Sequence, residues 1–250
     1  MELIKHQKVG SAIADPLANL SVIGIFQIAE EAITELMGKL EIDDIVATRE
    51  YNAVWVFAKS KLKIIKNIVW NEDFTVTCFI SKITRASICI DVEIKNKSDE
   101  LCSYSRVELC ALDLQSGRIR KVSTVGVDEN AEAHIPPIEI SFAKFDSEDL
   151  PEADKVKVKY TNIDFAGHTN NKEYIRFVLN TYSAKELEAR PIREMDVVYI
   201  NQSYENDVLT VRRGGFNDKD ILTVEKGNMT IVKCEIVRGD NPLSYQNHNS

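Results

Sequence analysis

The sequence predicts an α+β protein of two similar halves, each an antiparallel β-sheet wrapped around a central α-helix. Each half begins with a short strand and a loop that lead into a helix. Segments rich in β-branched residues follow each helix, and they partly alternate apolar with polar side chains, as strands do. The length of 250 residues suits two domains of ordinary size.

The composition restricts the partners and the location. Hydrophobic residues make up 44% of the chain, enough for a substantial core. The formal net charge of −8 argues against nucleic-acid binding, because phosphate recognition needs a basic surface. No apolar run has the length of a membrane span, and the N-terminus has no apolar signal core. We therefore expect a cytoplasmic protein without a membrane span.

The cysteines do not indicate a metal or a disulfide framework. They number five, and no two form a CxxC pair. We expect them to be small buried hydrophobes in strands. The sequence also contains no P-loop and no dinucleotide-binding glycine motif, so it implicates no nucleotide.

The helix of the first half should be buried. It is expected from Leu20 to about Leu40, and its first part is apolar nearly all round. In that part only Glu30, Glu31 and Glu35 should reach water.

The first domain is expected over residues 1–130, with Asn19 or Ser21 as the N-cap of its helix. Turn residues separate its apolar segments. Its strands are expected over 3–9, 54–57, 61–65, 74–80, 87–94 and 101–114.

A linker is expected over residues 131–154, which hold three prolines and a cluster of acids without sustained periodicity. The second domain should span 155–240, with a helix over about 170–182, and a polar tail should follow over 241–250. Its strands are expected over 155–160, 193–201, 208–213, 221–225 and 229–237.

Local similarity between the halves indicates a duplication. Asp15-Pro-Leu-Ala-Asn19 precedes the first helix, and Asp164-Phe-Ala-Gly-His168 precedes the second with the same spacing. Trp70-Asn-Glu-Asp73 similarly corresponds to Tyr204-Glu-Asn-Asp207. The order of these matches within one shared plan favours two copies of one unit.

The segment 163–175 carries the strongest chemical signal. It places Asp164 and His168 four residues apart, on a loop with Gly167 that leads into a helix N-terminus. Unpaired N–H groups at such an end can stabilise a developing oxyanion. A carboxylate can orient an imidazole, and the imidazole can activate water or bind a carbonyl oxygen. The alternative is a capped turn with a structural histidine.

The motif Gly167-His168-Thr-Asn-Asn171, followed by Tyr174, resembles the GHVNN..Y motif of acyl-acyl-carrier-protein (acyl-ACP) thioesterases. The resemblance includes Asp164, the segment 199–207, and segments around Trp55 and 68–70, and it covers about residues 5 to 240. It implies a double hotdog fold, no cofactor, and an enzyme that hydrolyses fatty acyl-ACP to free fatty acid and ACP.

Three positions depart from the family pattern. Ala166 stands where many members have asparagine, Gln202 where many have glutamate, and Ser203 where plant enzymes have cysteine. Alanine cannot hydrogen-bond a thioester, and glutamine is not a base, although its amide can position water. A serine hydroxyl is far less nucleophilic than a thiolate without an activating base. A cysteine-nucleophile mechanism is therefore not expected.

Since no cysteine occupies the nucleophile position, our hypothesis is that water attacks the thioester directly. Our hypothesis gives His168 the role of base, Asp164 that of its orienter, and Gln202 that of a water-positioning amide. Backbone N–H groups near Asn170 and Asn171 would form the oxyanion hole. In the rival assignment Asp164 is the base and His168 binds the substrate, and the sequence leaves both open.

The remaining substrate contacts follow from the same resemblance. Ser203 should lie near the substrate, without the G-x-S-x-G context of a serine nucleophile. The acyl chain should lie in a pocket of the N-terminal domain, with Ile23, Phe26 and Ile28 as candidate wall residues. The alternative for each of these three is ordinary core packing.

Other functions fit less closely. An acyl-CoA thioesterase would use the same chemistry, and a weakly catalytic acyl-ACP-binding protein would explain Ala166 and Gln202. A hotdog dehydratase matches the motif less well. Carrier proteins are acidic, and Lys61 and Lys63 are candidate contacts for one. The chain is expected as a monomer or a homodimer.

Overall fold

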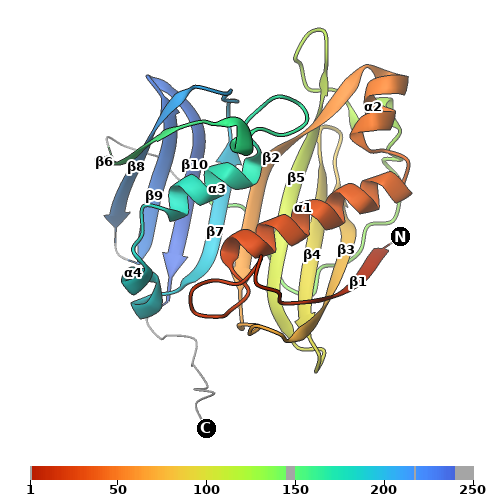
Figure 1. Ribbon diagram of the computed structural model, residues 1–250. Helices are drawn as coiled ribbons and strands as arrows, with labels where there is room; N and C mark the ends of the chain where they lie inside the picture. Colours follow the sequence, from red (N-terminus) through yellow and green to blue (C-terminus); the bar gives the residue numbers. More distant parts are fainter. Residues whose placement is uncertain (1, 145–149, 217, 240–250) are drawn as a thin grey trace.

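The sheet shows a near-symmetric order of strands. The computed structural model describes residues 2–144, 150–216 and 218–239, with the backbone alone at Phe216. Within these ranges ten strands form one sheet in the order β1-β3-β4-β5-β2-β7-β10-β9-β8-β6 (Figure 1). The order reads alike from both edges, and the expected α+β double hotdog architecture is present.

Over its described residues, the first half contains two α-helices and five strands, and a short 3-10 helix, η1, follows them. They are β1 (Glu2–Lys8), α1 (Val22–Lys39), α2 (Asp44–Tyr51), β2 (Ala53–Ile64), β3 (Asp73–Ile83), β4 (Ile88–Asn96), β5 (Leu101–Asp113) and η1 (Val122–Val125).

The second half repeats the plan with shorter helices. Its elements are β6 (Glu152–Lys157), η2 (Tyr160–Asn162), α3 (Asn171–Leu179), α4 (Ala184–Ala189), β7 (Ile192–Tyr199), β8 (Val208–Phe216), β9 (Lys219–Lys226) and β10 (Met229–Arg238).

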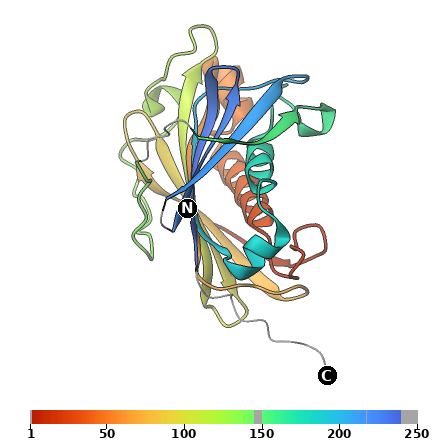
Figure 2. The same cartoon turned by 90° about the vertical axis from the view of Figure 1, so that its left-hand side faces the viewer.

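The first part of helix α1 is buried or partly buried throughout residues 22–30, as expected. Ser21 caps it by accepting a hydrogen bond from the Gly24 N–H at 2.9 Å. A Cβ on Gly24 would lie 2.7 Å from the Ile13 carbonyl oxygen, so this helix start requires glycine. Helices α1 and α3 contact each other and lie on the same side of the sheet (Figure 2).

The short helices α2 and α4 were not predicted, and two of the expected strands form the single strand β2. Helix α2 begins at an Asp43 cap but has no clear apolar stripe. The helix expected over about 170–182 is α3, which already ends at Leu179. Helix α4 follows outside that range, and Ser183 and Glu186 cap it reciprocally. A bulge in β2 shifts the side-chain alternation, so the segments 54–57 and 61–65 are one strand.

The cysteines are buried and free, and each lies in a strand, as expected. In the described ranges, no helix is long and apolar enough to cross a membrane. The tail expected over 241–250 lies outside the described residues, as do residues 145–149 of the expected linker.

The two halves are joined through the pairing of β2 with β7. This pairing runs from Lys59 opposite Val198 to Lys63 opposite Glu194. At its centre the Lys61 ammonium lies 2.7 Å from the Asp196 carboxylate, and both side chains are buried. Burial alone would lower the pKa of Lys61, but the hydrogen bond and charge of Asp196 raise it. Lys61 therefore forms a buried ion pair between the two halves. The expectation that it would contact a carrier protein at the surface was wrong.

Backbone hydrogen bonds define which residues of the halves are equivalent. The Leu20 N–H donates to the Ile68 carbonyl at 2.8 Å, and the Thr169 N–H donates to the Ser203 carbonyl at 2.9 Å. Counting back along both strands from Ile68 and Ser203 makes Lys61 the equivalent of its own partner Asp196. A pseudo-twofold axis thus passes between these two side chains.

The same count corrects the predicted alignment of the turns by one residue. Val69, and not Trp70, is the equivalent of Tyr204. The Val69 N–H bonds the Glu72 carboxylate at 3.2 Å, as the Tyr204 N–H bonds the Asp207 carboxylate at 2.9 Å.

We expect Lys61→Met to lower the free energy of unfolding by about 3–5 kcal/mol, because it leaves Asp196 buried without its partner. Lys63→Met is the matched control. It removes a partly exposed pair with Glu194, which should contribute less than about 1 kcal/mol. Urea unfolding followed by circular dichroism measures both, and equal losses would contradict a special role for the axial pair.

Candidate active site

The motif loop lies where the two halves meet. Residues 163–169 precede α3, and Asn170 caps that helix by accepting a hydrogen bond from the Lys172 N–H at 2.9 Å. The Asn170 amide also donates to the Glu30 carboxylate of α1 at 3.4 Å. One asparagine side chain thus joins the start of α3 to the helix of the other half.

The Asp164 carboxylate holds this loop in shape. Its Oδ1 atom accepts hydrogen bonds from the Ala166 N–H at 2.9 Å and the His168 N–H at 3.2 Å. Gly167 has φ +82°, a conformation that side chains with a Cβ rarely adopt. Among the described residues, no hydrogen bond joins this carboxylate to the His168 imidazole. The observed contacts of Asp164 are with backbone.

The first half contains the same loop without an imidazole. Asp15 Oδ1 accepts hydrogen bonds from the Leu17 N–H at 2.8 Å and the Asn19 N–H at 2.9 Å. Ala18, at φ +58°, takes the place of Gly167. Asn19 therefore occupies the position of His168, which confirms the predicted match between these loops and leaves only one copy with a titratable ring.

The His168 ring is accessible from solvent. It is partly buried and lies edge-on to the Tyr204 ring, with centroids 5.2 Å apart. Tyr204 is half exposed, and Phe165 at the tip of the loop is 96% exposed. The imidazole thus lies beside an aromatic ring that solvent reaches.

Ser203 is a structural anchor of the site. Its side chain is fully buried, and its hydroxyl lies 2.8 Å from Thr169 Oγ1 and 2.9 Å from the Tyr174 hydroxyl. The Ser203 N–H also donates to the Tyr174 hydroxyl at 3.0 Å. This network fastens the segment after β7 to the loop and to α3, and it leaves the neighbouring Gln202 exposed.

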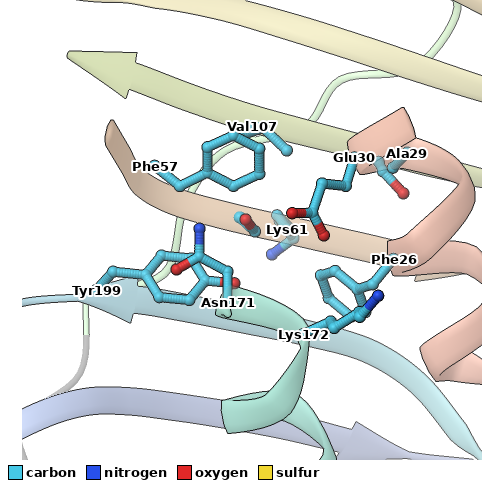
Figure 3. A pocket seen from close by; sticks show the side chains of 11 residues that line it. Phe26, Ala29, Glu30, Phe57, Lys61, Val107, Asn171, Lys172 and Tyr199 are labelled. Atoms are coloured by element: carbon cyan, nitrogen blue, oxygen red, sulfur yellow. The ribbon is translucent and has the colours of Figure 1, made fainter. Parts of the chain in front are cut away.

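A small cavity lies beside the start of α3, between α1 and strands β2, β5 and β7 (Figure 3). Its volume of about 10 Å³ is room for roughly one water molecule. It is lined by Phe26, Ala29, Glu30, Phe57, Ser60, Lys61, Ser105, Val107, Asn171, Lys172 and Tyr199.

The expected site residues divide into those at the cavity and those away from it. Asn171 and Phe26 line the cavity, whereas Ile28 is buried elsewhere in the core and Ile23 is partly buried off the lining. Asp164 and His168 lie in the loop that leads to α3.

The sequence did not single out Glu30 as a site residue, and it indicated Tyr199 only as part of the segment 199–207. Glu30 had been expected to face water, but burial raises its pKa, against the lowering effect of Lys172. A carboxylate in an otherwise apolar, buried helix was the signal that could have pointed to it. In the described part of the chain, no group of histidine, cysteine or acidic residues could hold a metal ion.

We expect Asp15→Ala and Asp164→Ala to lower the free energy of unfolding by similar amounts, about 1–3 kcal/mol each. Each change removes the acceptor of two backbone N–H groups. Chemical denaturation measures this, and an unchanged stability of Asp164→Ala would show that its carboxylate does not hold the loop.

Comparison with known proteins gives a consistent result across the chain. A model of the acyl-ACP thioesterase N-terminal domain matches residues 7–129, and a model of the acyl-ACP thioesterase C-terminal domain matches residues 146–239. No curated protein sequence matches the chain.

Solved structures share the fold over its whole length. An acyl-ACP thioesterase from Bacteroides thetaiotaomicron is 15% identical, with a TM-score of 0.85 over 95% of this chain and 97% of that one. A 12:0-ACP thioesterase from Umbellularia californica is 14% identical, with a TM-score of 0.82 over 96% of this chain and 98% of that one. These likenesses show the double hotdog fold, and the two matched domain models show that this chain belongs to the acyl-ACP thioesterase family of thioester hydrolases.

Proposed function

We propose that the chain hydrolyses fatty acyl-ACP in the cytoplasm to free fatty acid and ACP, by direct attack of water at the start of α3. The loop from Asp164 to Asn170 carries the proposal, because it brings an accessible imidazole to a helix N-terminus. Only the second copy of this loop has such a ring, so we place the reaction there.

The first turn of α3 is suited to stabilise the oxyanion. Backbone N–H groups at a helix start have no partner within the helix, and the helix dipole favours negative charge there. With the thioester carbonyl oxygen at Asn171, attack by water forms a tetrahedral oxyanion. Its collapse breaks the C–S bond and releases the thiol of the carrier's prosthetic arm, after which the acid departs.

Two roles of the imidazole are compatible with this geometry. His168 either takes the proton of the attacking water, with Asp164 fixing the loop that carries the ring, or it binds the thioester oxygen while a carboxylate takes the proton. We assign the positioning of water to the exposed Gln202 amide, which follows β7. The buried Ser203 supports the loop through Thr169 and Tyr174.

The acyl chain is proposed to enter the N-terminal domain between α1 and the sheet. Phe26 and Phe57 give the cavity apolar walls at the site. Because the cavity has room for only about one water molecule, a chain must displace side chains as it enters. The residue that yields most easily should then set the preferred chain length.

Acid release from acyl-ACPs and the matching acyl-CoAs tests the proposed reaction. We expect preferential hydrolysis of acyl-ACP, and a loss of about 10²–10⁴-fold in His168→Ala, because an acid–base group or a carbonyl ligand is removed. Hydrolysis of acyl-CoA alone would instead indicate an acyl-CoA thioesterase. Tight acyl-ACP binding without turnover would contradict hydrolysis and favour a binding protein. The departures from the family pattern at Ala166 and Gln202 would then explain the lack of catalysis.

Phe26→Ala tests the proposed acyl path. It should shift the ratio of kcat/KM between acyl-ACPs toward longer chains, since each additional buried CH₂ contributes about 0.8 kcal/mol. Ile28→Ala, also buried but off the cavity, controls for the effect of a core deletion. The same shift in both variants would remove Phe26 from the acyl path.

A further inference from the structure

We propose that Glu30, on the helix of the N-terminal half, is the general base that takes the proton of the attacking water. This inference rests on the proposed hydrolysis and assigns His168 the role of ligand for the thioester oxygen. The catalytic site would then be shared by the two halves of the chain.

In the C-terminal half, the carboxylate next to His168 holds the loop in shape, and the family's glutamate position carries an amide. The Asp164 Oδ1 atom already accepts two backbone N–H groups. Gln202 carries an amide at the position where the family commonly has glutamate, and an amide cannot take a proton at neutral pH. A carboxylate from elsewhere in the fold would fill this gap.

Glu30 lies where such a carboxylate is needed. Its Oε1 atom is 3.4 Å from the amide nitrogen of Asn170, the residue that caps α3. Its side chain lines the same cavity as Asn171, beside the proposed oxyanion position (Figure 3). The cavity has room for roughly one water molecule, the other reactant of the hydrolysis.

The surroundings leave the carboxylate available for proton transfer. Among the described residues, the Asn170 amide is its one hydrogen-bond donor, and no ion pair fixes it. Phe26, Phe57 and Val107 contribute apolar surface to the cavity. Glu30 is thus held in place without being neutralised by a close cation.

The charges that face Glu30 come from every element around the cavity. They are Lys172 on α3, Asp164 on the loop, Lys61 on β2, the phenol of Tyr199 on β7 and the neighbouring Glu31 on α1. Burial is the main cause of a raised pKa at Glu30, Asp164 and Glu31 add to it, and Lys172 and Asn170 oppose it. A carboxyl shifted upward is a stronger base once ionised.

The proposed step balances as follows. Glu30 removes a proton from water while the water oxygen bonds to the thioester carbon. The carbonyl oxygen becomes an oxyanion at the Asn171 N–H, since the Lys172 N–H already bonds the Asn170 side chain. When the C–S bond breaks, the leaving sulfur takes a proton from the Glu30 carboxyl. The carboxylate is regenerated, and the acid and the thiol are the products.

Glu30→Gln in the full chain tests the assignment, with Glu31→Gln as the matched control. Glu31 is exposed on the same helix, and its side chain bonds only Gln27, at 3.0 Å, among the described residues. With a panel of acyl-ACPs, Glu30→Gln should lose about 10²–10⁴-fold in kcat with an unchanged circular dichroism spectrum, and Glu31→Gln should match the parent.

The pH profile separates a base from a purely structural residue. The parent's kcat should fall as the pH drops through the pKa of Glu30, which lies above the ordinary value of 4.5. The residual activity of Glu30→Gln should lack this acid limb, since no base remains to be protonated. A retained acid limb, or a kcat equal to that of Glu31→Gln, would overturn the proposal.

The outcomes also separate this inference from the proposed function. A parent enzyme that is active, with an inactive His168→Ala and a fully active Glu30→Gln, would retain the hydrolysis and reject Glu30. A parent that hydrolyses no acyl-ACP would reject the function itself, and Glu30 as its base with it.

Discussion

The pairing of β2 with β7 is the constraint on which the rest of the molecule depends. It makes two sheets continuous and places a buried ion pair, Lys61 with Asp196, at the pseudo-twofold axis. Because the pairing fixes both halves in register, α1 and α3 must lie against each other on one side of the sheet. The start of α3 then faces Glu30, and the site forms at this seam.

The equivalent loops of the two halves differ in sequence, and this explains why only one of them carries an imidazole. The loops of the two halves keep the same aspartate and the same hydrogen bonds to backbone, which shows that this aspartate is required by the loop itself. The imidazole is the difference, with Asn19 in one copy and His168 in the other. The cap differs too: among the described residues, the Ser21 side chain bonds its own helix, whereas the Asn170 side chain also bonds Glu30.

Most of the fold could be predicted because the spacing of apolar residues and the turn residues indicate the same elements along the chain. The predicted match between the Asp15 and Asp164 loops is also present in the structure. What failed had local causes: the bulge in β2 concealed one strand as two, and α2 and α4 are too short to show a period. The cavity could not be foreseen, because Glu30, Asn171 and Tyr199 meet only through the register of the halves. Lys61 looked like a surface residue for the same reason.

The central claim is that one reaction uses groups from both halves, and a double-mutant cycle of Glu30→Gln with His168→Ala tests it most directly. Residues that act on one transition state have strongly non-additive effects on kcat/KM. We predict that hydrolysis of acyl-ACP by the double variant is about as slow as by the slower single variant. Losses that multiply, or a cycle in which Glu30→Gln has no effect, would contradict a site shared across the seam.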